Sequence, residues 1–424
     1  MTFIPIQEAI NKKKGKIAIH GWIHRIRKMK DKIFIVLRDS SEIIQCVIKD
    51  PKLVKQADSL LTESSLEIEG NIYAEKRAPT NYEIEVKKLK LIGAAEDFPI
   101  GKDQNPEFLL DNRHLSIRSR KLTSTLKIRS TIMGALHEKI RSLKFIEAEA
   151  PSFSGETSEG GSDVFEVNYF GKKAFLTQSW QFYAESLIFP FEKVYAMAPS
   201  FRAEKSKTGR HLTEFWHFEV EAAWSNLNDV IKIAEECIIY SIKKVLKDNK
   251  KDLEILEIKE DKLKKIKSPF PRITYDQAIK VLNKKGFKTK YGEDLGTKEE
   301  KELVKHYGEF VVVTNYPLKI LKFYHGEDPK KMGTGMNFNL LASNVGELVD
   351  GSQREPDIKK IKDRLKKEGV NLGKSDWYLD SRRYGSVPHA GFGLGTERFV
   401  QWLCNLESIK DAIPFPRTMK RLSP

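Results

Sequence analysis

Basic, acidic and aromatic side chains gather in the segment PSFRAEKSKTGRHLTEFWHFEVEAAW. Arg202 and Glu204 are two residues apart, so they share one face of the predicted first strand. Arg210 and His211 close the loop that follows, and Phe215 comes early in the second strand. Basic groups for a phosphate, together with an aromatic face for a base, are typical of a nucleotide site. The alternative is an exposed hairpin held by ion pairs.

The second strand of this segment carries His217, Glu219 and Glu221 on one face. Two carboxylates on a strand face are costly to bury unless cations or hydrogen-bond donors lie opposite them. This face therefore predicts either a polar site or an exposed surface.

Alternating glycines occupy the segment YGSVPHAGFGLGTERFVQWL, at Gly391, Gly393 and Gly395. They leave one side of an extended run bare, so a ligand or another backbone can approach closely. A helix is predicted from near Thr396, and its N-terminal amides together with Arg398 could hold an anion. The pattern differs from the dinucleotide fingerprint GxGxxG, and no βαβ unit surrounds it. A tightly packed strand is the alternative.

Two carboxylates, Glu347 and Asp350, stand three residues apart before a Gly-Ser turn and Arg354. Near a nucleotide they would suit Mg²⁺, which takes one or two carboxylates plus phosphate oxygens. Spacing alone favours the alternative, an ion pair between an acid and arginine.

A further polar stretch supplies Glu159 and then Ser179 and Gln181. Their carboxylate and polar groups suit recognition of an amine and an amide in a ligand, although loops are polar by default.

The elements that must position these groups fall into two parts. Residues 1–95 alternate apolar and polar residues over about five short runs, which favours an oligonucleotide-binding (OB) type barrel over other small β domains. A linker with Pro99 and Pro106 spans residues 96–122. The remainder, 123–424, mixes strands such as KVYAMAPSF, HFEVEAAW and FVVVTNYP with an amphipathic helix at 123–143.

Composition excludes several classes. The chain has 424 residues and a formal charge of +15, which indicates a globular protein of two or three domains with a polyanionic partner. The sequence has no apolar run of membrane-spanning length and no signal peptide, and its three cysteines form no CxxC pair. We therefore expect a cytoplasmic protein without membrane attachment, disulfide framework or zinc knuckle.

Together, FRAE…RHLTEF and GFGLGTER resemble motifs 2 and 3 of the class II aminoacyl-tRNA synthetases, and Pro151 resembles the motif 1 proline of their dimer interface. The match covers nearly the whole chain, because the N-terminal module resembles the OB anticodon-binding domain of the aspartyl, asparaginyl and lysyl subgroup. Within it, EFWHFEVEAAW and RRYGSVPHAGFGLG resemble the archaeal and eukaryotic asparaginyl branch. The resemblance implies an α+β fold, with an OB barrel before a catalytic domain built on an antiparallel sheet flanked by helices.

This resemblance implies an ATP site made by Arg202, Glu204, Arg210, His211, Leu212, Phe215, Glu347, Gly395 and Arg398. The catalytic groups would be Arg202, on the α-phosphate and the amino-acid carboxylate, and Arg398, above the adenine and at the γ-phosphate. Glu204 would contact the adenine amino group, and Phe215 would stack on the other face of the base. Arg210 and His211 would meet the outer phosphates. Mg²⁺ would bind Glu347 and Asp350, although aspartyl relatives often carry Ser or Thr at the second position.

The implied amino-acid site consists of Glu159, Ser179, Gln181, Arg202, Glu219 and Arg354. Glu159 and Gln181 would bind the substrate α-amino group. Aspartyl enzymes carry a lysine where this chain has Ala184, and an aspartate where it has Glu219. A neutral amide could accept from Arg354 and donate to Glu219, whereas a substrate carboxylate would meet Glu219 as a like charge. The residues therefore favour L-asparagine.

In the N-terminal module, Phe34 and Gln45 match the aromatic and the amide that read the central anticodon uridine in this subgroup. A core position in the barrel is the alternative for Phe34.

The expected partners are ATP, L-asparagine, tRNA(Asn) and a second copy in a homodimer. Alternative functions are an aspartyl or non-discriminating synthetase, an adenylate-forming amide synthetase, and a non-catalytic RNA-binding or signalling paralogue. The role of residues 247–330 is left open.

Overall fold

The computed structural model describes residues 2–101, 103–155, 163–204, 211–368 and 376–424. The chain divides into two compact units, Met1–Leu109 and Leu110–Pro424, and each is described by itself. Among the helices of the described residues, none is long and apolar enough to cross a membrane.

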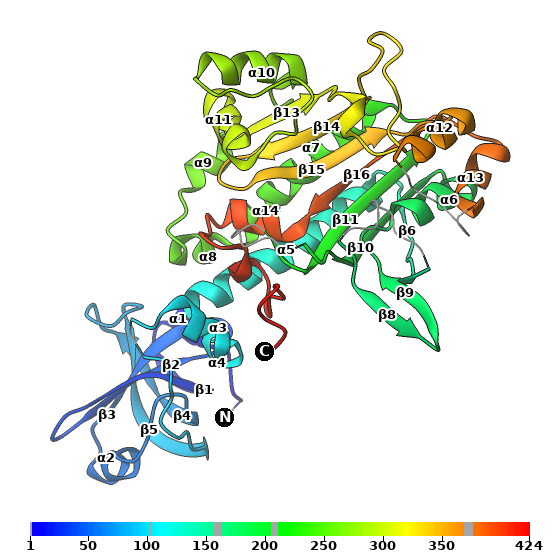
Figure 1. Cartoon of the computed structure of the whole chain (residues 1–424). Coiled ribbons are helices and arrows are strands. Elements are labelled where there is room, and N and C mark those ends of the chain that lie inside the picture. The colour runs from blue at the N-terminus through cyan, green and yellow to red at the C-terminus, as the bar shows by residue number, and fades with distance from the viewer. Residues whose placement is uncertain (1, 102, 156–162, 205–210, 369–375) are drawn as a thin grey trace. The chain divides into compact units, whose positions relative to one another are not determined.

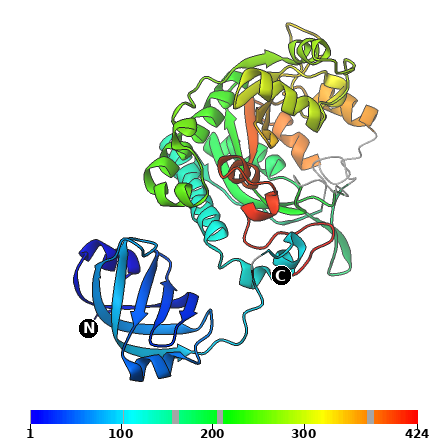
Figure 2. The same cartoon turned by 90° about the vertical axis from the view of Figure 1, so that its left-hand side faces the viewer.

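The N-terminal unit is a closed five-stranded barrel in the order β1-β2-β3-β5-β4 (Figures 1 and 2). Its strands are β1 (Gly15–Lys28), β2 (Ile33–Arg38), β3 (Ile43–Ile48), β4 (Ser65–Ala74) and β5 (Tyr82–Gly93), with the short helices α1 (Ile6–Lys12) and α2 (Pro51–Ala57) beside them. The alternation predicted from the sequence is present: in β2, Ile33, Ile35 and Leu37 are buried in the barrel core. The OB-type barrel is confirmed.

The C-terminal unit is built on an eight-stranded sheet in the order β12-β13-β14-β15-β16-β11-β10-β6. These strands are β12 (Arg272–Thr274), β13 (Phe310–Thr314), β14 (Asn337–Ala342), β15 (Gly346–Gln353), β16 (His389–Gly395), β11 (Glu214–Ala223), β10 (Lys193–Phe201) and β6 (Ile146–Glu147). The inner pairs are antiparallel, and the outermost pairs at either end are parallel. The three strands predicted from the sequence correspond to β10, β11 and β13.

Long helices cover one face of this sheet (Figure 1). They are α5 (Arg120–Ser142) and α7 (Leu227–Asp248), and α14 (Thr396–Leu403) follows β16. Apolar residues of these helices, such as Ile132 and Ile238, join one core with Phe218, Leu340 and Phe392 of the sheet. Because this face is occupied by the core, polar side chains of the strands gather on the other face.

The helix predicted at 123–143 is α5, which begins three residues earlier. The side chain of Ser119 caps it by accepting from the amide of Leu122. Further along α5, Arg129 pairs with Glu397 of α14 at 2.8 Å, and Glu397 also accepts from the amide of Trp216 in β11. These buried contacts tie the start of α14 to the sheet.

Smaller elements surround this framework. They are α3 (Pro106–Asp111), α4 (Arg113–Ser116), β7 (Phe153–Ser154), β8 (Glu166–Tyr169), β9 (Lys172–Leu176), α6 (Gln181–Phe191), α8 (Lys250–Ile255), α9 (Glu260–Lys264), α10 (Tyr275–Lys284), α11 (Thr297–Tyr307), η1 (Leu318–Ile320), α12 (Ile358–Glu368), α13 (Asp376–Arg383) and η2 (Ile409–Ala412). Strands β7, β9 and β8 form a separate three-stranded sheet.

Candidate active site

A cavity of about 360 Å³ lies on the polar face of the eight-stranded sheet. Its walls come from β11, β14, β15 and β16, from the residues that follow β10, from the starts of α6 and α14, and from the segment before β14. The predicted site residues that line it are Ser179, Gln181, Arg202, Glu204, His211, Leu212, Phe215, Glu219, Glu347, Asp350, Arg354, Gly395 and Arg398. Glu159 and Arg210 lie outside the described residues.

One wall holds the cation, carboxylate and aromatic ring predicted for a nucleotide. Arg202 directly follows β10, and its amide donates to the carbonyl of Thr213, which closes the hairpin with β11. The guanidinium carbon of Arg202 lies 5.5 Å from the centroid of the Phe215 ring. Glu204 lies 4.0 Å from Arg202 and 3.5 Å from His211. This wall can therefore present positive charge beside a flat apolar surface.

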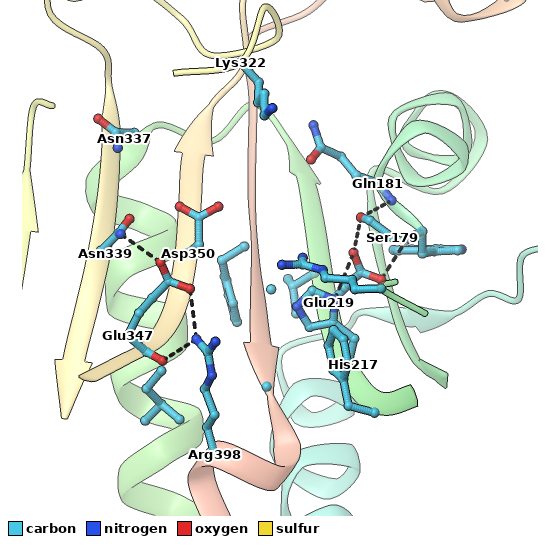
Figure 3. A pocket seen from close by; sticks show the side chains of 18 of the residues that line it. Ser179, Gln181, His217, Glu219, Lys322, Asn337, Asn339, Glu347, Asp350 and Arg398 are labelled. Carbon is cyan, nitrogen blue, oxygen red and sulfur yellow. Dashed lines mark hydrogen bonds and ion pairs between the residues drawn. The ribbon is translucent and has the colours of Figure 1, made fainter. Parts of the chain in front are cut away.

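The opposite wall carries the two carboxylates predicted for a metal ion (Figure 3). Arg398 Nη1 donates to the carbonyl oxygen of Glu347 at 2.7 Å and to its side chain at 3.1 Å. Asn339 Nδ2 donates to the other carboxylate oxygen of Glu347 at 3.0 Å. Asp350 lies opposite Asn339 in the β14–β15 register and opposite Gly393 in β16. Hard oxygen atoms thus cluster next to a cation that is held by the start of α14.

The sequence alternative for these acids is partly correct. Glu347 does form an ion pair with an arginine, but its partner is Arg398 rather than the nearby Arg354. Asn339 was not predicted to belong to the site. The alternation of asparagine with apolar residues in the strand run NFNLLA was the available signal for it.

Glu219 lies in the floor of the cavity and is 5% exposed. Ser179 Oγ donates to its Oε1 at 2.5 Å, and the amide of Trp180 donates to Oε2 at 2.9 Å. Figure 3 shows this chain of contacts from Gln181 through Ser179 to Glu219. Burial raises the pKa of Glu219, and the two hydrogen bonds with the charges of Arg202 and Arg354 offset part of that shift. The result is a carboxylate oriented by fixed donors.

The second carboxylate of this strand face, Glu221, is bound by Arg354. Arg354 donates from Nε and Nη2 to the two oxygens of Glu221, at 3.1 and 2.8 Å, and from Nη1 to Ser352 Oγ at 2.8 Å. Burial raises the pKa of Glu221, and the adjacent guanidinium works against that rise. Glu221 is therefore a buried carboxylate with the cationic partner that the sequence indicates for this strand face, and that partner is Arg354.

The alternating glycines of β16 serve two different purposes. A Cβ atom on Gly391 would overlap the Glu221 carboxylate and the carbonyl of Val220, and one on Gly393 would overlap the His217 ring. These two positions confirm the packed-strand alternative, because they admit side chains of the neighbouring strand β11. A Cβ on Gly395 would make only ordinary contacts, the nearest at 3.7 Å to the Arg398 side chain, so a side chain would not be excluded by overlap at this point where the cavity meets α14.

The stretch at 247–330, whose role the sequence leaves open, also contributes to the cavity. Asp294, Tyr316, Lys322 and His325 line it. Burial, together with the charge of Arg354, lowers the pKa of His325 to about 3, so the imidazole is neutral at physiological pH. Sequence reasoning did not find these residues because they follow no motif spacing and reach the cavity through loops beside α11 and η1.

In the barrel unit, Phe34 lies on the outer face of β2 and is outside the barrel core. The charged groups of Arg27 and Lys32 lie 4.8 and 5.6 Å from its ring centroid. Gln45 Nε2 donates to Glu83 at 2.5 Å, and the Tyr73 hydroxyl donates to the same carboxylate. The core alternative for Phe34 is thereby excluded, and the outer face offers a ring flanked by cations.

The family model described as tRNA synthetases class II (D, K and N) matches residues 105–419, and the OB-fold nucleic acid binding domain matches residues 17–92. The chain is 43% identical over 415 residues to the asparagine–tRNA ligase of Thermoplasma acidophilum, covering 97% of each chain. It is 44% identical over 413 residues to that of Thermococcus gammatolerans, covering 96% of each. The fold superposes on the asparaginyl-tRNA synthetase of Pyrococcus horikoshii complexed with asparaginyl-adenylate, with a TM-score of 0.96, 41% identity and full coverage of both chains.

Proposed function

Because the chain belongs to the class II tRNA synthetases of the aspartyl, lysyl and asparaginyl group, we propose that it is the asparagine-specific ligase that charges tRNA(Asn). It uses ATP to activate L-asparagine and transfers the asparaginyl group to the 3′ end of the tRNA. One observation carries the choice of amino acid: the buried Glu219 and Arg354 line the same cavity as Arg202 and Phe215.

The chemistry requires two displacements. An oxygen of the asparagine carboxylate attacks the α-phosphorus of ATP, the bond to the bridging oxygen breaks, and pyrophosphate leaves. A ribose hydroxyl of the tRNA terminus then attacks the carbonyl carbon of asparaginyl-adenylate, and AMP leaves. No protein nucleophile is needed, so catalysis rests on placement of the reactants and on charge stabilisation by Arg202 and Arg398.

The nucleotide lies between Phe215 and Arg398 in this proposal. Phe215 stacks on one face of the adenine, Arg398 covers the other face, and Glu204 accepts from the adenine amino group. Arg210 and His211 contact the outer phosphates, and Leu212 and Gly395 border the base. The cation beside an aromatic ring on one wall and the arginine at the start of α14 on the other support this placement.

Glu347 and Asp350 are proposed to hold Mg²⁺. The fit is judged from the donor set, because two carboxylates beside the carboxamide of Asn339 offer the hard oxygen atoms that this ion prefers. When bound there with the phosphates, the ion neutralises charge that develops on pyrophosphate.

The substrate amino acid is proposed to occupy the floor of the cavity. Glu159 and Gln181 bind its α-amino group, Ser179 orients Glu219, and Arg202 meets its carboxylate. The side-chain amide of asparagine accepts from Arg354 and donates to Glu219, whereas an aspartate carboxylate would face Glu219 as a like charge. The donors from Ser179 and Trp180 support this assignment, since they hold Glu219 with its oxygens in place.

In the barrel, Phe34 and Gln45 are proposed to read the central anticodon base. We also retain as proposals a homodimer, a cytoplasmic location, and a division into residues 1–95, a linker at 96–122 and a catalytic part at 123–424.

Two assays test the proposed function. Replacing Arg202 with alanine should abolish asparagine-dependent ATP–pyrophosphate exchange, and near-normal exchange in that variant would overturn the mechanism. Charging of purified tRNA(Asn) and tRNA(Asp) with each amino acid tests the specificity. Preferential transfer of aspartate would identify an aspartyl or non-discriminating enzyme instead.

A further inference from the structure

Glu185 is a completely buried carboxylate that receives hydrogen bonds from four side chains. Its Oε1 accepts from Gln181 Nε2 at 2.8 Å. Its Oε2 accepts from the Tyr378 hydroxyl at 2.9 Å, and lies 3.1 Å from His389 Nε2 and 2.5 Å from Arg382. Burial acts to raise the pKa of this carboxyl, but the charges of Arg382 and His389 outweigh it, so the pKa lies below its ordinary value. Glu185 is therefore an anion at neutral pH.

The contact with Gln181 follows from helix geometry. The two residues are four apart in α6, so their side chains lie on the same face of the helix. Glu185 faces inward to α13 and β16, whereas Gln181 begins the helix and lines the cavity. Figure 3 shows the Gln181 side chain extending into that cavity.

An ionised carboxylate has no proton to donate, so it can only accept from a neighbouring carboxamide. It therefore selects one of the two orientations of the Gln181 amide, with Nε2 toward Glu185 and Oε1 turned away from it. A carbonyl oxygen presented to the ligand attracts an ammonium group, whereas an amide NH₂ in the same place would repel it.

We propose that Glu185 is a positioning residue that makes the enzyme selective for the α-ammonium group of its amino acid, by orienting the Gln181 carboxamide. Tyr378, Arg382 and His389 keep Glu185 in place from the side remote from the cavity. The inference rests on the proposed function only in that Gln181 is taken to meet the substrate α-amino group.

The test compares binding of L-asparagine with binding of succinamate, which is asparagine without its α-amino group. Isothermal titration calorimetry on the full-length protein gives both dissociation constants, and their ratio measures selectivity for the ammonium group. In Glu185→Gln, the new carboxamide can donate to Gln181 Oε1, so the Gln181 amide is free to turn. We expect the ratio to fall about tenfold or more, the scale of one hydrogen bond to a charged group, with succinamate affinity nearly unchanged.

Four further variants test whether the change in the ratio comes from the orientation of Gln181. Glu235→Gln is the matched control, because it neutralises another buried carboxylate: Glu235 lies in α7 and pairs with Arg272 of β12. This variant should leave the ratio unchanged. Glu185→Asp keeps the buried charge but withdraws the oxygen from Gln181. It should lower the ratio less than Glu185→Gln, and it can replace that variant if the latter does not fold.

Gln181→Ala distinguishes the proposed contact of Gln181 with the substrate from the proposed positioning role of Glu185. If it lowers the ratio and the Glu185 variants do not, the positioning role is wrong and the proposed site stands. If Gln181→Ala leaves the ratio unchanged, the assignment of Gln181 is wrong and the inference fails with it. Equal weakening of asparagine and succinamate in Glu185→Gln would show a merely structural role and would also overturn the inference. In the double variant Gln181→Ala/Glu185→Gln we expect no further loss of selectivity beyond that of Gln181→Ala.

Discussion

Glu221 of β11 and Arg354, which directly follows β15, form a bidentate ion pair with side chains that are 1% and 6% exposed. The pair sets the edge of the guanidinium that the substrate can meet, because Nε and Nη2 are both directed at Glu221. Nη1, which donates to Ser352 Oγ, lies on the other side of the guanidinium. An arginine held in this way can recognise a side-chain oxygen without first losing its own conformational freedom.

This pair predicts a large stability effect. In Glu221→Gln the arginine remains buried but loses its counter-charge, and removing one partner of a buried pair costs about 3–5 kcal/mol. We expect the free energy of unfolding in urea to fall by roughly that amount, together with a fall in kcat/KM for asparagine. Glu8→Gln, which breaks the exposed pair with Lys12, is the control and should leave stability unchanged. A Glu221→Gln variant as stable as the wild type would contradict the prediction.

Glu219 predicts a pH dependence of substrate choice. Burial raises its pKa, so it gains a proton at a higher pH than an exposed glutamate does. In the proposed site, ionised Glu219 would accept from asparagine and repel aspartate, whereas the protonated form could donate to aspartate. The ratio of kcat/KM for asparagine over aspartate should therefore fall as the pH is lowered from about 8 to about 5.5, measured by pyrophosphate exchange.

Glu219→Gln supplies the control for this dependence, because it has no proton to gain. Its ratio should be low at every pH, and a wild-type ratio that stays constant over the range would disprove the role of Glu219. The contribution of Glu219 to the stability of the fold depends on pH in the opposite direction to the substrate ratio: it grows as the pH is lowered. Folded Glu219 binds its proton more tightly than the unfolded chain does, so this contribution to stability is present at low pH. It is lost as the pH rises through the folded pKa.

Glu347 and Asp350 should respond differently to Mg²⁺. Asp350→Asn removes one of the two proposed charged ligands, so the concentration of Mg²⁺ for half-maximal pyrophosphate exchange should rise about tenfold, with the maximal rate recovered at high Mg²⁺. Glu347→Gln also disturbs Arg398, which donates to that side chain, so its maximal rate should stay low at all Mg²⁺ concentrations. Asp261→Asn, at an exposed carboxylate in α9, is the control. An unchanged Mg²⁺ requirement in Asp350→Asn would remove Asp350 from the site.

Local patterns predicted much of this architecture. Alternation located the barrel and the strands β10, β11 and β13, and helical spacing located α5 to within a few residues. Residues of the two hairpin strands and of the start of α14, which the resemblance to the synthetases groups in one site, line one cavity. Local sequence alone predicts only the neighbours within each contiguous segment. A short stretch of chain determines such neighbours.

Contacts set by strand register and helix docking could not be predicted in this way. Gly391 and Gly393 showed a bare strand face, but only the pairing with β11 reveals that Glu221 and His217 fill the space. The partners of Glu185 follow from no local pattern, because Arg382 and His389 lie about two hundred positions away and meet it only when α13 and β16 pack against α6. The cost of burying a charge implies that partners exist without indicating where they are.

Phe34 provides a prediction that distinguishes the role of the barrel unit from that of the C-terminal unit. Its ring lies outside the barrel core, with the cations of Arg27 and Lys32 4.8 and 5.6 Å from its centroid, so we expect it to stack on a base without being needed for folding. Base stacking on an aromatic side chain is worth about 1–3 kcal/mol, so Phe34→Ala should raise the KM for tRNA(Asn) about 5- to 150-fold in aminoacylation.

Pyrophosphate exchange without tRNA should be unaffected in Phe34→Ala, because this reaction uses only the cavity of the C-terminal unit. The melting temperature should likewise stay close to that of the wild type. Tyr291→Ala removes an exposed aromatic ring from the C-terminal unit and is the matched control, for which we expect no change in either assay. An unaltered KM for tRNA in Phe34→Ala would show that the ring does not stack on the anticodon. A parallel loss of exchange activity would instead show that Phe34 supports the fold, since the barrel would then influence the C-terminal unit without any tRNA present.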